Sequence, residues 1–267
     1  MKVFKIVLFS FLLFGLFSCQ QPIPDKGPIK IAISKAVPAK SYKNYVRWIH
    51  SVDSTIECLD MYHLSYDSAI LMLKECDGLL LTGGTDIYPG RYGKEEDTAR
   101  CWNPDFKRDT MEANLIREGI KLEMPIMGIC RGLQNLNVFF DGTLYIDLPS
   151  DLDTIVKHQL PKTYKANHEI TIQQGSLLHE ISGVTSGFVN SNHHQGIEVL
   201  AYQLNGIART QDGLIETIEL KNRGDYPFLL GVQWHPERMD YTNPLSGKIA
   251  HRFVEEAKRY SNNYSHE

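Results

Sequence analysis

The chain has 267 residues, of which 42% are hydrophobic and 22% are charged, and its formal net charge is −4. This composition is ordinary for a globular protein and leaves room for one large α/β domain or two small ones. The balance of charge is slightly acidic, without the basic surplus that indicates a nucleic-acid-binding protein.

The N-terminal segment has the pattern of an export signal. Lys2 and Lys5 precede an apolar stretch at 6–17, which is shorter than the roughly 20 residues of a membrane-spanning helix. The stretch runs into Leu-Phe-Ser-Cys, which resembles the lipobox of bacterial lipoproteins and implies that Cys19 is lipidated and becomes the mature N-terminus. Ordinary signal cleavage and an uncleaved anchor are the alternatives.

This pattern divides the chain into three parts. We predict a lipoprotein signal peptide at 1–18, a tether at 19–28 and one folded domain at 29–267. Without the signal peptide, 26 basic residues remain beside 32 acidic ones. The lipid, rather than attraction to an anionic surface, is therefore expected to hold the protein at a membrane in the cell envelope.

The first part of the domain alternates between strands and helices. The apolar patterns predict strands at 29–33, 59–64 and 78–81, and helices at 41–58 and 68–75. This order is typical of a parallel sheet with right-handed crossovers. Gly83 and Gly84 follow the third strand, at the edge where open α/β sheets bind their ligands.

The stretch 87–105 is interrupted by prolines and glycines and is predicted to be a loop. An amphipathic helix is expected at 106–122. Asp109 and Glu112 are three residues apart on this helix and therefore share a face. They have either a structural role, fixing the helix near the Gly83-Gly84 turn, or a direct role in chemistry.

A cysteine lies at the next transition from strand to helix. The apolar run 126–129 predicts a buried strand, and helical spacing begins after Gly132, so Cys130 occupies the turn within a G-x-C-x-G frame. This frame is the cysteine counterpart of the G-x-S-x-G nucleophile elbow, in which flanking glycines give the strained turn room. A helix N-terminus beside the sulfur favours the thiolate.

Two further features complete a catalytic pattern. His235 follows an apolar run at 228–232, and Glu237 lies two residues on. A cysteine, a histidine and an orienting carboxylate are the parts of a nucleophilic triad. The Gly83-Gly84 turn can offer backbone N–H groups to an oxyanion.

Together these motifs resemble the class I glutamine amidotransferase-like superfamily, and most closely its γ-glutamyl hydrolase branch, peptidase family C26. The resemblance runs from about residue 29 to the C-terminus, on six segments: 79–93, 107–116, 125–149, 189–197, 212–219 and 231–237. It implies a three-layer α/β sandwich with a mostly parallel central sheet, the flavodoxin-like fold of that superfamily.

The resemblance also implies an activity and a set of site residues. The activity is hydrolysis of the γ-glutamyl amide bond of a small molecule or peptide through a thioester, without a cofactor or metal. The catalytic residues would be Cys130, His235 and Glu237, and the oxyanion-hole and substrate-binding residues Gly83, Gly84, Arg131, Gln134 and His194. The Arg131 side chain would either act at the site, by favouring the thiolate or holding a substrate carboxylate, or point away and leave only its backbone to act. The alternatives are a glutaminase subunit that supplies ammonia to a partner enzyme, and a binding lipoprotein without activity.

The remaining segments carry less information. A turn and short strand are predicted at 142–149, several short strands at 170–220 and a closing helix at 247–260. His158 and His168 are interpreted as ordinary surface or core histidines. His193 and His194 are adjacent on an extended segment and so point to opposite faces, which makes them a poor metal site.

Three cysteines have no assigned role, namely Cys58, Cys76 and Cys101. None of them forms a C-x-x-C pair, so zinc-ribbon and thioredoxin-like sites are not supported. The sequence leaves open whether two of them form a disulfide or all three are free thiols.

Overall fold

The structure is a computed structural model that describes residues 27–37, 42–152, 155–160, 166–226 and 228–263. The predicted signal peptide, and Cys19 in the predicted tether, lie outside these residues. Among the described residues, no helix is long and apolar enough to cross a bilayer.

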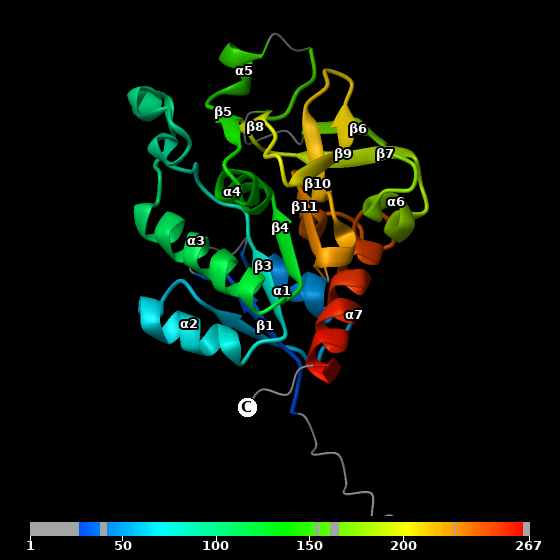
Figure 1. The fold of residues 1–267 in the computed structure, drawn as a ribbon. Coiled ribbons are helices and arrows are strands. Elements are labelled where there is room, and N and C mark those ends of the chain that lie inside the picture. The colour runs from blue at the N-terminus through cyan, green and yellow to red at the C-terminus, as the bar shows by residue number, and fades with distance from the viewer. Residues whose placement is uncertain (1–26, 38–41, 153–154, 161–165, 227, 264–267) are drawn as a thin grey trace, which may run out of the picture.

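One nine-stranded sheet organises the molecule (Figure 1). Its strand order is β2-β1-β3-β4-β11-β10-β9-β6-β7. The first five strands in this order are parallel and the remaining pairs are antiparallel. The sheet strands are β1 (Lys30–Ile33), β2 (Glu57–Asp60), β3 (Gly78–Leu81), β4 (Ile126–Ile129), β6 (Ala166–Ile172), β7 (Ser186–Ser191), β9 (Leu204–Thr210), β10 (Ile215–Leu220) and β11 (Leu229–Val232). A separate two-stranded sheet pairs β5 (Thr143–Tyr145) with β8 (Gly196–Val199).

Helices cover both faces of the parallel half. Figure 1 shows α2 (Tyr66–Lys74) and α3 (Phe106–Lys121) on one side of the sheet and α7 (Gly247–Asn263) on the other. The remaining helices are α1 (Lys43–His50), α4 (Arg131–Phe139), α5 (Leu148–Asp151) and α6 (Leu177–Ser182), with 3-10 turns η2 (Pro89–Tyr92), η3 (Glu95–Arg100), η4 (Arg223–Asp225) and η5 (Pro236–Arg238). The predicted three-layer α/β architecture is therefore confirmed.

The sequence of the parallel strands explains this arrangement. Ile31 and Ile33 of β1 pack into the core beneath α1 and α7, whereas Ala32 between them packs into the core beneath α2, α3 and α4. Successive side chains of a strand point to opposite faces, so a strand covered on both faces must be apolar throughout. The same division holds for the other central strands and produces two cores, one on each face.

Several predicted boundaries were wrong. The helix predicted at 41–58 ends at His50, and β2 begins at Glu57 rather than at residue 59. Asp53 accepts a hydrogen bond from the Thr55 N–H at 3.0 Å, and such local side-chain bonds favour a turn over a helix. The stretch 87–105 contains two 3-10 helices, and α6 interrupts the region predicted to hold only strands.

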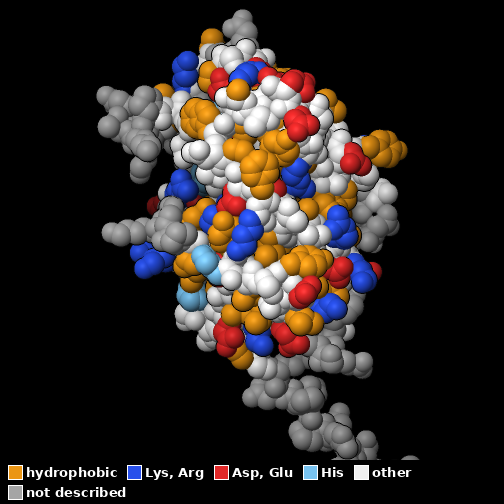
Figure 2. Space-filling model, turned by 90° about the vertical axis from the view of Figure 1, so that its left-hand side faces the viewer, with side chains coloured by type: hydrophobic (Ala, Val, Ile, Leu, Met, Phe, Trp, Pro, Cys, Tyr) orange, Lys and Arg blue, Asp and Glu red, His pale blue; other side chains and the backbone are white. Residues whose placement is uncertain are grey.

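The surface carries both signs of charge. On the face in Figure 2, Lys and Arg side chains alternate with Asp and Glu, and no extended patch of one sign is visible. The sequence expectation that nucleic acid is not a partner stays a prediction. Cys58, Cys76 and Cys101 are free thiols, and burial raises the pKa of each to about 12.

Candidate active site

Cys130 occupies the turn between β4 and α4. Its φ of 53° and ψ of −105° are unusual for a residue with a side chain, and it serves as the N-cap of α4. A Cβ at Gly128 would lie 2.8 Å from the Gly132 carbonyl carbon, and a Cβ at Gly132 would lie 2.9 Å from that of Leu81. The predicted need for two glycines around this turn is thereby confirmed as a steric requirement.

His235 follows β11, the strand that lies next to β4. β11 pairs in parallel with β4, and Val232 lies opposite Ile129, so the residues after both strands meet at one edge of the sheet. His235 Nδ1 lies 2.9 Å from Glu237 Oε1, and both side chains are buried. The Cys130 side chain lines the same small cavity as the His235 ring. The structure therefore brings together the three residues predicted to form the triad.

The surroundings of His235 keep its ring charged. Burial by itself would lower the pKa of the imidazole, but the Glu237 carboxylate and the Cys130 sulfur outweigh burial and raise the pKa of His235 to about 9. Glu237 also contacts Arg238, whose Nε lies 2.9 Å from Glu237 Oε1. An imidazolium next to a cysteine at neutral pH is the arrangement that supplies a proton to a departing amine.

The Gly83-Gly84 turn borders the cysteine as predicted, but its two N–H groups differ. The Gly83 N–H donates to the Tyr45 hydroxyl at 2.9 Å, so in this structure it is not open to an oxyanion. A Cβ at Gly83 would lie 2.9 Å from His235 Cε1 and 3.5 Å from Cys130 Cβ, which places the turn against both side chains. Gly84 is exposed, which leaves its N–H as the donor that the turn can offer.

The Arg131 side chain does not line the site. It is buried and pairs with Asp109 and Glu112 of α3, away from Cys130. Of the two alternatives for this side chain, the second is therefore correct. The Arg131 N–H begins α4, where the first turn of a helix has no internal acceptor, and so can point toward the sulfur.

Asp109 and Glu112 have the structural role. Glu112 accepts hydrogen bonds from the Arg108 Nε and from the Ser34 hydroxyl, each at 2.7 Å. Arg108 in turn donates to the Gly83 carbonyl at 3.0 Å and to the Thr82 carbonyl at 2.7 Å. The α3 helix thus fixes the turn beside the nucleophile from behind.

Two cavities meet at the cysteine. A small cavity of about 110 Å³ lies directly over it and is lined by Tyr42, Tyr45, Gly83, Gly84, Cys130, Asn192, His235 and Arg238. A second cavity of about 390 Å³ also reaches Cys130, and both Gln134 and His194 line it, as the sequence analysis expected for His194. Gln134 donates to the Gln195 carbonyl at 3.0 Å, which orients its amide within this wall.

His194 is held rigidly in the wall of that second cavity. Its Nε2 lies 2.9 Å from Asp86 Oδ1, its Nδ1 lies 3.2 Å from Asp147 Oδ1, and its ring stacks on Trp102 with centroids 3.8 Å apart. Burial alone would lower the pKa of His194, but the two carboxylates raise it. Asp86, Trp102 and Tyr45 were not predicted as parts of the site, because only the fold brings them into the cavities that contain Cys130.

The other histidines are not isolated. His158, His168 and His193 surround Glu216, which is fully buried on β10. His158 and His168 are both buried core residues, one of the two placements predicted for them, but the sequence did not show that they share one cluster with a carboxylate. The sequence signal was the Asp212-Gly213-Leu214-Ile215-Glu216 segment, whose Glu216 looked equally like an exposed hairpin residue.

This fold, with a cysteine after β4 and a His–Glu pair after β11, defines a class I glutamine amidotransferase-like α/β protein. The sequence matches the Peptidase C26 family over residues 32–237, and the protein belongs to that family.

Individual relatives agree with this assignment. The chain is 36% identical over 190 residues to gamma-glutamyl-gamma-aminobutyrate hydrolase PuuD of Escherichia coli, covering 68% of this chain and 72% of the relative. It is 38% identical over 191 residues to protein NtpR of Enterococcus hirae, covering 71% and 78% respectively. The glutaminase domain of CTPS from Trypanosoma brucei, solved with bound acivicin, superposes with a TM-score of 0.62 at 14% identity, over 86% of this chain and 94% of that one. This last similarity shows the fold alone.

Proposed function

We propose that the protein is a cysteine-dependent hydrolase of γ-glutamyl amide bonds. The observation that carries the proposal is the buried His235–Glu237 pair beside Cys130, which lines the same small cavity as His235 and lies on a turn that strains its backbone. Membership in the Peptidase C26 family and the similarity to a gamma-glutamyl-gamma-aminobutyrate hydrolase support a γ-glutamyl substrate.

Each step of the proposed reaction is assigned to a side chain or backbone group of the site. The Cys130 thiolate attacks the γ-carbonyl carbon of the glutamyl group, and the developing oxyanion is held by the N–H groups of Gly84 and Arg131. The His235 imidazolium gives its proton to the leaving amine as the C–N bond breaks, leaving a thioester on Cys130. Neutral His235 then takes a proton from water, which attacks the thioester and releases glutamate and the thiolate. One oxyanion-hole donor typically contributes about 10²–10³ in rate.

The leaving group has room beside His235. A cavity of about 470 Å³ lies on that side of the triad, with the exposed Phe188 ring, Met239 and Leu160 among its lining residues, together with His235 itself. Because His235 protonates the amine, the amine must lie next to this ring. A leaving group larger than ammonia, such as an amino acid or peptide, therefore fits the site.

The test is glutamate release by the purified full-length protein from a panel of γ-glutamyl amides, γ-glutamyl peptides and glutamine. Cys130→Ala is the matched variant, and its circular dichroism and melting temperature are compared with those of the parent. We expect release from at least one γ-glutamyl compound, and none above background from Cys130→Ala with its fold intact. Turnover that persists in Cys130→Ala would rule out the proposed nucleophile.

The same panel separates the alternative functions. A glutaminase subunit would release ammonia from glutamine mainly when a partner enzyme is added. A binding protein without activity would bind γ-glutamyl compounds, while its Cys130 would resist labelling by a γ-glutamyl electrophile. Labelling of Cys130 that depends on His235, together with glutamate release from γ-glutamyl compounds by the unlabelled protein, is the result expected of the hydrolase.

A further inference from the structure

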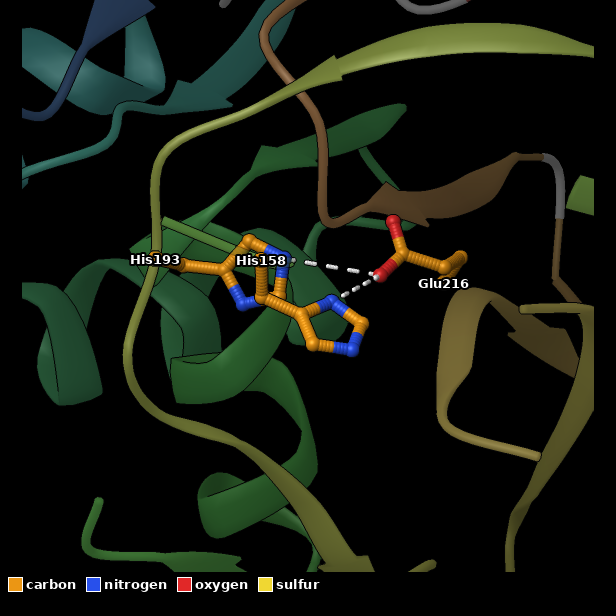
Figure 3. A group of neighbouring side chains, drawn as sticks. All are labelled: His158, His193 and Glu216. Carbon is orange, nitrogen blue, oxygen red and sulfur yellow. Dashed lines mark ion pairs between the residues drawn. The ribbon is translucent and has the colours of Figure 1, made fainter. Parts of the chain in front are cut away.

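The buried cluster around Glu216 lies outside the triad and has no part in the proposed reaction. His158 Nδ1, His193 Nε2 and a Glu216 carboxylate oxygen lie within 4.8 Å of one another, and all three side chains are buried (Figure 3). The three residues come from separate places in the chain, namely the segment 155–160, the connection between β7 and β8, and strand β10. Figure 3 shows both rings turned toward the same carboxylate oxygen.

The outer contacts of the two rings fix where their protons lie. His193 Nδ1 lies 2.9 Å from the Gln195 carbonyl, which only accepts hydrogen bonds, so Nδ1 carries the proton. His158 Nε2 lies 2.9 Å from the Asp212 carboxylate and carries the proton for the same reason. When the rings are neutral, His193 Nε2 and His158 Nδ1 therefore face Glu216 with lone pairs. Metal-binding histidines are typically held in this way by a carbonyl or carboxylate on the opposite ring nitrogen.

Nothing among the described residues satisfies the atoms that face inward. His158 Nδ1, His193 Nε2 and both Glu216 oxygens have no hydrogen-bond partner there. Glu216 has no Lys or Arg ion-pair partner in the described part of the chain, and the ion-pair partners of its carboxylate within 4 Å there are histidines. A fully buried carboxylate without a compensating cation is costly.

The distances between the histidine nitrogens and the Glu216 carboxylate distinguish a metal site from a direct hydrogen bond. Glu216 Oε1 lies 3.4 Å from His193 Nε2 and 3.7 Å from His158 Nδ1. An imidazolium hydrogen-bonded to a carboxylate would stand about 2.7–2.9 Å away. Two donors that bind one tetrahedral zinc ion at about 2.1 Å lie roughly 3.4 Å apart. The observed distances match two ligands of one metal ion better than the two partners of a hydrogen bond.

We propose that His158, His193 and Glu216 bind a divalent transition-metal ion, with zinc as the expected ion. Two imidazoles and one carboxylate form a ligand set that suits zinc and leaves a fourth position for water. His168 approaches the other carboxylate oxygen, with Nε2 3.4 Å from Glu216 Oε2, and so positions the ligand rather than joining the set. This inference replaces the expectation from the sequence that no metal is bound.

The location of the site assigns a role to the ion. His193 lies between Asn192 and His194, and all three line the cavity that contains Cys130. A metal ion would tie this wall to β10 and to segment 155–160. The ion would therefore hold the substrate-binding wall in place without contacting Cys130 or His235.

The experiment measures metal binding rather than activity. The full-length protein without a polyhistidine tag is prepared as Cys130→Ala, because Cys130 and His235 would otherwise form a competing zinc-binding pair. It is incubated with zinc chloride, freed of excess metal by gel filtration and analysed by mass spectrometry for metal content. We expect about one zinc ion per chain, as for a single site with three protein ligands. We expect zinc to be lost in His193→Asn and Glu216→Gln, and retained in the matched neighbour His194→Asn.

Three further measurements keep the result decisive if Glu216→Gln fails to fold. His158→Asn, which removes a ligand from a segment near the surface, should also lose the ion. Cobalt bound in place of zinc should give visible absorption bands without the near-ultraviolet bands of thiolate ligands. Zinc should raise the melting temperature of Cys130→Ala but not that of the histidine variants. Zinc content far below one per chain, or zinc that survives His193→Asn and His158→Asn, would overturn the proposal.

Discussion

Cys130 combines two properties that a nucleophile needs, a strained backbone and a charged neighbour. Its positive φ is a conformation that costs a residue with a side chain about 1–3 kcal/mol and that is concentrated at functional sites. The strain is held by close backbone packing at Gly128 and Gly132, so the glycines are part of the catalytic turn.

Replacing Gly132 with alanine tests this packing. The added Cβ would lie 2.9 Å from both the Leu81 carbonyl carbon and its Cβ, which is too close for atoms in contact. Overpacking of this kind costs about 1–3 kcal/mol, so the free energy of unfolding in urea should fall by that amount and activity should fall with it. Gly224→Ala is the control, because no atom lies within 4 Å of its Cβ position, and a similar loss in both variants would contradict the packing explanation.

The charge on His235 predicts the pH dependence of the reaction. The pKa of His235 is raised to about 9, so the imidazolium is present below that pH and is lost as the pH rises through it. We expect kcat/KM to be level around neutrality and to fall above about pH 9. Glu237→Gln removes the group that raises this pKa most, so the alkaline limb should move to lower pH.

Glu237→Gln should also lower the maximum rate, by about 10²–10⁴-fold, since it removes the group that orients the base. Circular dichroism checks that the variant is folded. An alkaline limb that stays at the same pH in Glu237→Gln would show that another group titrates there.

At the scale of single residues, the sequence predicted which residue types form the site but not where their side chains and N–H groups point. The order Cys130, His235, Glu237 was readable because each lies directly after an apolar strand or its turn. The sequence could not predict that the Arg131 side chain points away from Cys130, or that the Gly83 N–H donates a hydrogen bond to Tyr45. Both depend on Glu112 and Tyr45, which come from helices that only the folded chain brings near.

Among the elements, α3 supports the site most directly. Glu112 is fully buried and receives hydrogen bonds from Ser34, Arg108, Arg131 and Asn135. Burial alone would raise the pKa of Glu112, but Arg108 and Arg131 hold it at about 2. The carboxylate thus connects α3 to the β3 turn and to the start of α4.

Glu112→Gln should therefore destabilise the protein and weaken the turn. Breaking a buried ion pair leaves an uncompensated charge, here on Arg108, since Arg131 keeps its pairing with Asp109, and costs about 3–5 kcal/mol of unfolding free energy. Chemical denaturation measures this loss directly. Glu118→Gln on the same helix loses only a 3.6 Å contact with the exposed Lys121, so its stability should stay within about 0.5 kcal/mol of the parent. Equal effects in the two variants would exclude a special role for Glu112.

The elements themselves were predicted unevenly. The short apolar runs at β1, β3 and β4 were found within one residue, because a strand buried on both faces shows a continuous apolar pattern. The end of α1, the start of β2 and the whole of α6 were missed. Their limits depend on local side-chain bonds such as Asp53 to Thr55 and on packing against α7, which periodicity does not record.

At the scale of the whole molecule, the candidate active site and the start of the domain lie at opposite ends of the parallel strands. Cys130 and His235 follow the carboxyl ends of β4 and β11, so the site lies at that edge. β1 runs parallel to these strands through β3, and its first residue, Lys30, therefore lies at the opposite edge. The segment that leads from residue 19 to β1 therefore joins the domain on the side away from Cys130.

We propose on this basis that a lipid on Cys19 anchors the protein with its site facing away from the membrane. The wild-type protein should sediment with membranes and incorporate labelled fatty acid, and Cys19→Ala should appear in the soluble fraction without label. Cys101→Ala is the control, since it removes a cysteine outside the lipobox and should stay membrane-bound. Because the site lies at the far edge of the sheet, the anchored and released forms should hydrolyse a soluble γ-glutamyl substrate with the same kcat/KM. Fatty-acid label that remains in Cys19→Ala would refute the anchor, and a marked gain in kcat/KM on release would refute the orientation.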